Sequence, residues 1–222
     1  MLLSGFKRTR SQIYNDLFWK NGYLYIKDYF SHKDADTIVK IADELDSWEE
    51  KKGKWMIYFE KDKQKKKSRI ENIVNYHPQL KDLVDYNITP TLQLLYNKPM
   101  NLFKDKMNWK KGFGKGFKAH QDQPAWSDFP PQRFVSVAMF GNKSNLENGC
   151  LEFSSGEHKN GLYDYDMSNL GELTKEVEDN LTWTPIETTP RDLLLFDSYV
   201  PHRSGSNKTD KERRIIYLTY NS

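Results

Sequence analysis

The sequence predicts a mainly β protein with flanking helices, in which helices pack against an all-β sandwich or barrel. Two observations predict this class. Helical spacing of apolar residues is concentrated in about the first hundred residues, whereas short β-prone runs separated by turns fill the rest. No internal repeat and no Gly-, Ser- or Pro-rich linker interrupts the chain, so we expect a single domain over residues 1–222.

The first part, about 1–100, is expected to form a helical buttress and the first strands. Apolar residues three and four apart predict helices, and alternation of apolar and polar residues predicts strands. In chain order, the expected elements are a helix over 11–19 ended by Asn21-Gly22, a strand over 23–30, a helix over 31–48 with Ser31 as its N-cap, a strand over 54–60, and a helix over 80–95 that is broken or kinked near Pro90.

The second part, about 101–222, is expected to hold the β core. Its apolar residues gather in short β-rich runs, and turn residues lie between these runs. The runs are 102–109, 134–140, 150–153, 182–186, 192–196 and 213–220. Many short strands of this kind favour two packed sheets or a closed barrel.

Composition limits the class of protein. Aromatic residues make up 14% and the net charge is only +3, which argues against disorder and gives no sign of a nucleic-acid partner. The single cysteine, Cys150, excludes an intramolecular disulfide framework. Because no run is long and apolar enough for a membrane span or a signal peptide, we expect a cytoplasmic protein that binds no membrane. We also expect a monomer or a homodimer.

Three residues form a candidate metal site. His120 and Asp122 stand two positions apart, and in an extended segment such residues point to the same face. His202 lies just beyond the apolar run 192–196. Two histidines and one carboxylate form the facial triad that holds Fe(II) in non-haem oxygenases. A His-x-Asp pair also arises often by chance, as a turn histidine beside an exposed aspartate.

An arginine follows this candidate site along the chain. Arg213 begins the apolar strand over 213–220 and could clamp the carboxylate of a keto acid with two hydrogen bonds. Arg214 should point to the opposite face of the same strand. The spacing from His202 favours Arg213 for this role.

These features together resemble the phytanoyl-CoA dioxygenase-like family of Fe(II)/2-oxoglutarate oxygenases. The resemblance covers nearly the whole chain. Three blocks carry it: His120-Gln121-Asp122 with Ala125-Trp126; Asn148-Gly149-Cys150-Leu151 and the run to Gly161; and residues 192–196 with His202, Ser204, Asn207 and Arg213. An upstream part, Arg69-Ile70-Glu71-Asn72 and residues 102–108, resembles the bacterial small-molecule hydroxylases of the family.

The resemblance implies a double-stranded β-helix, the jelly-roll or cupin-like core, with helices against one sheet. It implies that His120, Asp122 and His202 hold Fe(II) and that 2-oxoglutarate and O2 are co-substrates. The distal carboxylate of 2-oxoglutarate would lie on Arg213 and Ser204. Family members usually continue beyond the strand over 213–220, so we expect their C-terminal tail to be absent here or supplied elsewhere.

Other residues are expected around the substrate. Asn108 and Gln121 match positions that approach the co-substrate in relatives, and Trp126 matches an aromatic residue near the substrate pocket. Lys106 shares one strand face with Lys104, and this face either lines the pocket or points to solvent. Arg69 could likewise border a substrate.

The resemblance implies hydroxylation of a C–H bond in a small polar metabolite, with release of succinate and CO2. The candidates are an aminoalkylphosphonate, an amino acid or a quaternary ammonium compound. One alternative is a non-catalytic jelly-roll module that binds a metabolite or senses iron. Another is a protein or tRNA hydroxylase, supported only by the lysine-rich run 61–67, which is most simply a solvated loop.

Overall fold

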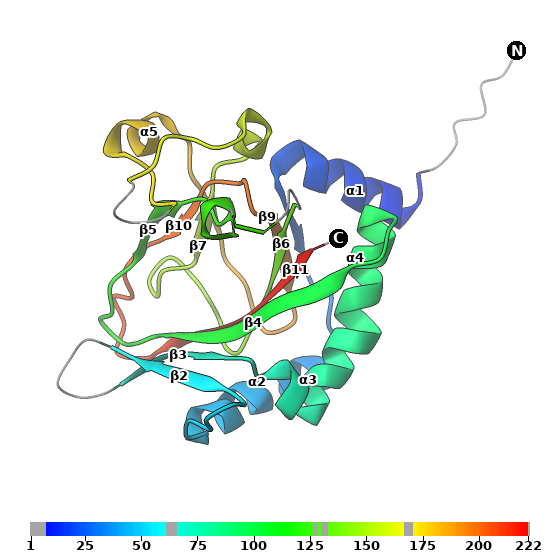
Figure 1. Cartoon of the computed structure of the whole chain (residues 1–222), viewed down its shortest axis with the longest axis vertical. Coiled ribbons are helices and arrows are strands. Elements are labelled where there is room, and N and C mark those ends of the chain that lie inside the picture. Colours follow the sequence, from blue (N-terminus) through cyan, green and yellow to red (C-terminus); the bar gives the residue numbers. More distant parts are fainter. Residues whose placement is uncertain (1–7, 61–65, 127, 130–132, 167–170, 222) are drawn as a thin grey trace, which may run out of the picture.

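Two antiparallel β-sheets face each other at the centre of the computed structural model, which describes residues 8–60, 66–126, 128–129, 133–166 and 171–221 (Figure 1). The larger sheet has the strand order β1 (Tyr23–Ile26), β9 (Leu193–Asp197), β6 (Val135–Phe140), β11 (Arg213–Asn221), β4 (Asn101–Lys110), β3 (Lys67–Glu71) and β2 (Met56–Phe59). The smaller sheet has the order β5 (Phe117–His120), β10 (His202–Ser204), β7 (Leu151–Phe153) and β8 (Thr184–Ile186). This arrangement confirms the predicted jelly roll with flanking helices.

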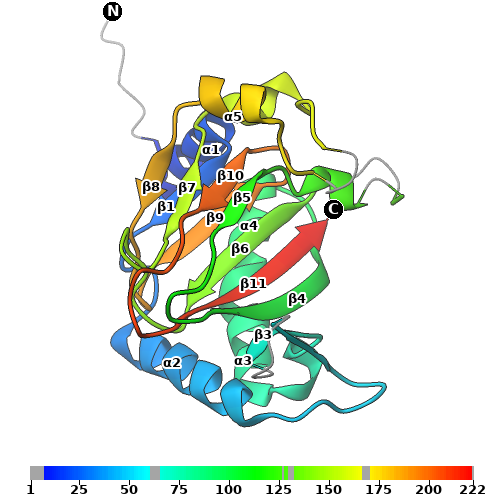
Figure 2. The same cartoon turned by 90° about the vertical axis from the view of Figure 1, so that its left-hand side faces the viewer.

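Helices cover the outer face of the larger sheet. Figure 2 shows the smaller sheet in front of the larger one, with α1 and α4 on the far side. The helical elements are α1 (Arg10–Asn21), α2 (His32–Ser47), α3 (Pro78–Leu83), a π-helical turn (Val84–Ile88), α4 (Thr89–Tyr96), α5 (Lys175–Asn180) and three short 3-10 helices (Val74–Tyr76, Gln123–Trp126 and Glu157–Asn160). No helix in the described ranges is long and apolar enough to cross a membrane.

Strand alternation divides the buried side chains between two apolar layers. On β11, Ile216 and Leu218 pack toward the helices, whereas Ile215 packs between the two sheets with Phe140 and Phe196. All six residues of β6 are buried, because helices cover one face of this strand and the smaller sheet covers the other. Apolar side chains therefore fill one end of the space between the sheets. At the other end, polar side chains of β4 and β11 line a cavity.

Local signals in the first part of the chain are confirmed. The Ser31 side chain caps α2 by accepting a hydrogen bond from the backbone N–H of Asp34, at 3.1 Å. The helix before it ends at Gly22, whose φ of 81° is the left-handed conformation that glycine adopts without strain. Pro90 lies in the first turn of α4, directly after the π-helical turn, so the α-helix is interrupted just before Pro90 although the chain remains helical from α3 to α4.

Three strands and one helix were not predicted. Strands β3, β5 and β10 have three to five residues, too few for alternation to stand out, and α5 is a single short polar helix. The expected strand over 23–30 ends early, at Ile26. Most of the lysine-rich run, residues 61–65, lies outside the described residues. Its last member, Lys67, is not in a loop, because it begins β3 and donates to the carbonyl of Trp48 at 2.7 Å.

Candidate active site

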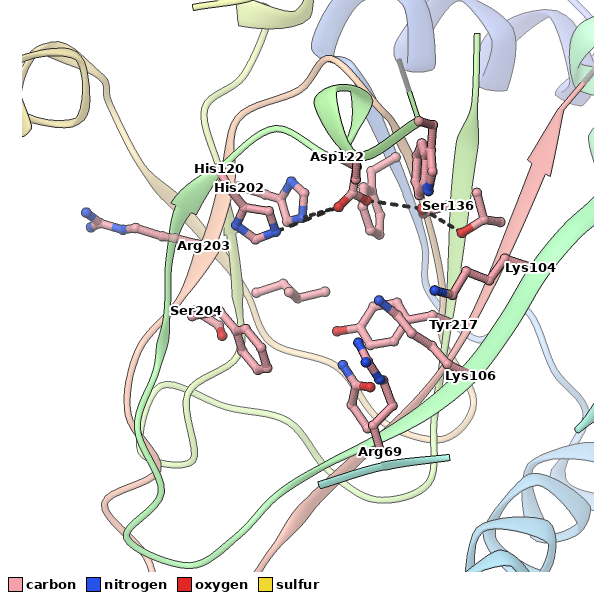
Figure 3. Close-up of a pocket in the computed structure, with 17 residues that line it drawn as sticks. Arg69, Lys104, Lys106, His120, Asp122, Ser136, His202, Arg203, Ser204 and Tyr217 are labelled. Carbon is pink, nitrogen blue, oxygen red and sulfur yellow. Dashed lines mark hydrogen bonds and ion pairs between the residues drawn. The ribbon is translucent and has the colours of Figure 1, made fainter. Parts of the chain in front are cut away.

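A cavity of about 230 Å³ lies between the two sheets (Figure 3). His120 lies at the end of β5 and His202 at the start of β10, and the two residues are paired across these neighbouring strands. Asp122 follows two residues after His120, where the chain leaves the sheet. All three line the cavity.

The three side chains are brought together as predicted. Asp122 Oδ1 lies 3.7 Å from His120 Nε2 and 3.9 Å from His202 Nε2. The three ligand atoms all lie within 4.8 Å of one another. Two imidazole nitrogens and one carboxylate oxygen at this separation can converge on a single metal ion, and such a triad leaves coordination positions open for other ligands.

Backbone carbonyls orient both imidazoles toward the metal position. The Nδ1 atom of His120 lies 2.7 Å from the carbonyl of Lys118, and that of His202 lies 3.1 Å from the carbonyl of Val200. A carbonyl can only accept, so each Nδ1 carries the proton and each Nε2 presents its lone pair. On the other side, the Ser136 hydroxyl donates to Asp122 Oδ2 at 3.4 Å.

The charge states also fit a divalent cation. Burial, and then the nearby His120, lower the pKa of His202 to about 4, so its imidazole is neutral at pH 7. Burial raises the pKa of Asp122, but the two imidazoles in their protonated forms, Lys106 and the hydrogen bond from Ser136 outweigh this effect and lower the pKa below its usual value. Neutral imidazoles and an ionised carboxylate are the forms that bind metal. The donor set therefore fits Fe(II).

The residues expected for 2-oxoglutarate lie in or beside one part of the cavity wall. Ser204 is on β10 and Asn108 on β4, and both line the wall. The Asn108 Oδ1 atom is buried without a hydrogen-bond partner among the residues described. Arg213 is not among the residues that line the cavity. It is 1% exposed, and its Nη1 donates to the carbonyl of Gly149, which also accepts from Lys110. Its Nε has no hydrogen-bond partner within the described part of the chain.

Gln121 does not agree with its expected role. It lies between His120 and Asp122 and is 1% exposed, and alternation turns its side chain away from the cavity wall. Its Nε2 donates to the carbonyls of Gly161, at 2.8 Å, and Tyr199, at 2.6 Å. Its Oε1 accepts from the N–H of Tyr163 at 2.9 Å. The amide is therefore fully occupied in holding the loop around Gly161, so Gln121 is not available to the co-substrate.

Cationic side chains occupy the wall opposite the triad. Figure 3 shows Lys104, Lys106 and Arg69 pointing into the cavity across from the two histidines. Strand β4 alternates, so Lys104 and Lys106 share one face with Asn108, and the alternative that this face points to solvent is wrong. Burial lowers the pKa of Lys106.

A single carboxylate holds two of these cations in place. Glu71 Oε1 lies 3.0 Å from Arg69 Nε and 3.1 Å from Lys104 Nζ. Strand β3 brings Arg69 opposite Asn108 and Glu71 opposite Lys106. The predicted substrate residues Arg69 and Lys106 therefore come together through a strand pairing that the sequence did not reveal.

Trp126 was expected near the substrate pocket, and it lines the same cavity as the three candidate metal ligands. It ends the 3-10 helix Gln123–Trp126 and lines the cavity. Its ring packs against Phe134, with 4.8 Å between centroids, and against Phe103, at 6.3 Å. These aromatic neighbours pack the indole in place at the cavity wall.

Sequence reasoning missed several residues of the cavity, among them Ser136, Tyr217, Thr219 and Arg203. Tyr217 and Thr219 lie on the same face of β11 as Arg213, and the period of two in this strand was the signal that could have found them. Arg203 is also in the wall, but it pairs with Glu152 and Glu178, at 3.1 and 2.9 Å. Figure 3 shows its guanidinium directed away from the triad.

The class of protein follows from this fold and site together with a family comparison. A jelly roll with a His-Asp-His triad in its cavity is the architecture of Fe(II)/2-oxoglutarate oxygenases. The family model described as phytanoyl-CoA dioxygenase matches residues 18–215. The chain therefore belongs to the phytanoyl-CoA dioxygenase family.

Individual relatives agree with this family. The chain is 36% identical over 208 residues to a 2-aminoethylphosphonate dioxygenase from uncultured bacterium HF130_AEPn_1, covering 91% of this chain and 79% of the relative. It is 33% identical over 216 residues to a methylphosphonate hydroxylase from Gimesia maris, covering 96% and 81%. The fold matches that of EctD from S. alaskensis, solved with 2-oxoglutarate and 5-hydroxyectoine, with a TM-score of 0.81 at 20% identity, over 100% of this chain and 79% of EctD.

The chain is an Fe(II)- and 2-oxoglutarate-dependent dioxygenase. The complete ligand triad, the family and the curated relatives, which are themselves named as a dioxygenase and a hydroxylase, all agree on this activity. They give no support to the alternative of a non-catalytic binding or iron-sensing module.

Proposed function

We propose that this dioxygenase hydroxylates a small organophosphonate, and that the cationic wall of the cavity binds its phosphonate group. The net charge on this wall carries the proposal. Arg69, Lys104 and Lys106 supply three positive charges, and Glu71 supplies one negative charge. The excess of two charges matches a phosphoryl group, which carries about −1.5 to −2 charges at pH 7. A carboxylate substrate would leave about one positive charge uncompensated.

The relatives support this substrate class. One is named for 2-aminoethylphosphonate and another for methylphosphonate, and these two compounds share only the phosphonate group. The cationic wall would recognise this shared group. Trp126 would present an aromatic face to an ammonium group where the substrate carries one.

The metal and the co-substrate take the remaining groups of the cavity. His120, Asp122 and His202 would hold Fe(II), and Arg213 and Ser204 would bind the distal carboxylate of 2-oxoglutarate. Fe(II) with 2-oxoglutarate and O2 supplies the oxidising chemistry that hydroxylates a C–H bond and releases succinate and CO2. The chain's own part is to orient both organic molecules and to keep bulk water out of the cavity.

The phosphonate class can be tested with pairs of compounds that differ only in the acidic group. We would measure succinate release with 2-aminoethylphosphonate against β-alanine and with methylphosphonate against acetate. Phosphorus NMR would detect any hydroxylated product. We expect at least one phosphonate to stimulate succinate release and its carboxylate counterpart to be ineffective. Equal stimulation by both members of each pair would contradict the proposal.

The cationic wall can be tested with Lys106→Met. We expect the KM for the active phosphonate to rise by about 10-fold or more, because a hydrogen bond to a charged group contributes about 1.5–3 kcal/mol. The affinity for 2-oxoglutarate should not change. Lys40→Met, which alters an exposed lysine on α2, is the matched control and should leave the KM unchanged. An unchanged KM in Lys106→Met would place the phosphonate elsewhere.

A further inference from the structure

Two buried cations lie side by side behind the wall that carries Ser204. Lys110, the last residue of β4, is directly opposite Arg213, the first residue of β11. Lys110 is 3% exposed and Arg213 is 1% exposed. Within the described ranges, neither side chain forms an ion pair with a carboxylate. Burying two like charges together is unfavourable unless an anion compensates them.

The hydrogen bonds of Lys110 are made to neutral oxygen atoms. Its ammonium donates to Ser204 Oγ at 2.7 Å, to the carbonyl of Gly205 at 2.5 Å and to the carbonyl of Gly149 at 3.2 Å. Arg213 Nη1 donates to the same carbonyl of Gly149. The two cations therefore converge on one small region, and Ser204 is the member of this region that lines the cavity.

The contact with Lys110 determines what the Ser204 hydroxyl can do. An ammonium group only donates, so Ser204 Oγ must be the acceptor in this pair. The hydroxyl proton of Ser204 then remains free to point at a second acceptor. A carboxylate in the cavity at this position would receive that proton, next to the charges of Lys110 and Arg213.

The pKa of Lys110 is consistent with a site that binds an anion. Burial, and then the charge of Arg213, lower the pKa of Lys110 to about 7. An anion bound beside Ser204 would favour the charged form of this lysine. The assignment of Arg213 and Ser204 to the distal carboxylate belongs to the proposed function, and the role of Lys110 rests on it.

We propose that Lys110 is a positioning residue for 2-oxoglutarate: it holds the Ser204 hydroxyl as a hydrogen-bond donor and places a second positive charge beside Arg213. The distal carboxylate of the co-substrate is the anion that this arrangement accommodates. Lys110 therefore distinguishes a dicarboxylic keto acid from a keto acid that lacks the second carboxylate.

The test is an anaerobic titration of the Fe(II)-loaded protein, monitored through the visible charge-transfer band of the bound keto acid. Two ligands are compared, 2-oxoglutarate and 2-oxobutyrate, which lacks the distal carboxylate. For Lys110→Met, we expect the Kd for 2-oxoglutarate to rise at least 10-fold and the Kd for 2-oxobutyrate to change less than threefold. Lys111→Met, which alters the next lysine and its ion pair with Glu212 at 2.7 Å, should change neither Kd.

Further variants separate positioning from a structural role. Lys110→Arg keeps the charge and should restore most of the preference for 2-oxoglutarate. If Lys110 acts through Ser204, Ser204→Ala combined with Lys110→Met should weaken 2-oxoglutarate by less than the product of the two single effects. Should Lys110→Met fail to fold, Lys110→Arg and Ser204→Ala give the same comparison of the two ligands.

Results that contradict the role of Lys110 differ from results that contradict the co-substrate site itself. An unchanged Kd for 2-oxoglutarate in Lys110→Met would overturn the inference, and so would an equal loss for both ligands, which indicates a general distortion of the site. The absence of a charge-transfer band in the wild-type protein, or a normal Kd for 2-oxoglutarate in Arg213→Met, would instead contradict the underlying assignment of the co-substrate site.

Discussion

Lys110 illustrates how the surroundings of one side chain set its charge. Charged groups of two strands face it. Arg213 on β11 lowers its pKa, whereas Cys150, just before β7, and Glu152, on β7, raise the pKa by smaller amounts than burial and Arg213 lower it. The result is a pKa of about 7 in the folded protein against 10.5 for an ordinary lysine. Above pH 7, the unfolded chain therefore holds a proton that the folded chain has lost.

This difference predicts a pH dependence of stability. Between about pH 7 and 9.5, the unfolded state of the metal-free protein binds more protons at Lys110, so the free energy of unfolding rises with pH, by at most about 1.4 kcal/mol per unit. Urea unfolding of the wild type and of Lys110→Met at several pH values measures this contribution as the difference between their slopes. Parallel pH profiles for the two proteins would show that Lys110 has an ordinary pKa.

At the scale of elements, a glycine determines how closely α2 approaches the larger sheet. Gly141 directly follows β6, and a Cβ atom at this position would lie 2.7 Å from the Cβ of Ala42, which is fully buried on α2. The same added atom would lie 3.2 Å from the Cβ of Arg214. The helix and the sheet can meet here only because both residues are small.

Gly141→Ala should therefore destabilise the protein by about 1–3 kcal/mol, the usual cost of overpacking a buried contact. Gly205→Ala is the matched control, because an added Cβ there meets no atom within 4 Å, and we expect a much smaller change. Chemical denaturation of both variants measures the effect. In the double variant Gly141→Ala with Ala42→Gly, part of the lost stability should return, and an additive loss would show that the two sites do not interact.

At the scale of the whole molecule, the active site depends on both sheets and on distant parts of the chain. The metal ligands come from the smaller sheet and the chain that follows it, whereas the cationic wall comes from β3 and β4 of the larger sheet. A metal ion bound by His120 and His202 links β5 to β10 and requires the folded arrangement. Metal binding should thus stabilise the folded state.

We expect Fe(II), added without oxygen at about 100 times its Kd, to stabilise the wild type by about 2.7 kcal/mol. For a chain of this length, this corresponds to a rise in Tm of about 5–10 °C. Thermal unfolding followed by circular dichroism measures the shift. His202→Ala should lose it, and His32→Ala, which alters an exposed histidine at the start of α2, should keep it. An equal shift in His202→Ala would place the metal at other residues.

Much of the fold was predictable because its signals are local. The N-cap at Ser31, the stop at Gly22 and the interruption of the α-helix just before Pro90 each act within one turn of a helix, so neighbouring residues are enough to identify them. The longer strands were also predicted from their apolar runs. The short strands β3, β5 and β10 were not, because their existence depends on pairing with distant partners.

For the site, residue chemistry alone indicated His120, Asp122 and His202. Few side-chain types bind iron, so the types of these three residues and their order in the chain are enough to suggest an iron site. Tertiary structure decided the remaining roles. Because side chains alternate along the strand, the Gln121 side chain points away from the cavity and binds the loop around Gly161. Arg69 lies near Lys106 because β3 pairs with β4. The net charge of the cationic cavity wall and the lowered pKa of Lys110 both arise from groups that are far apart in the chain. Only the folded structure could therefore reveal them.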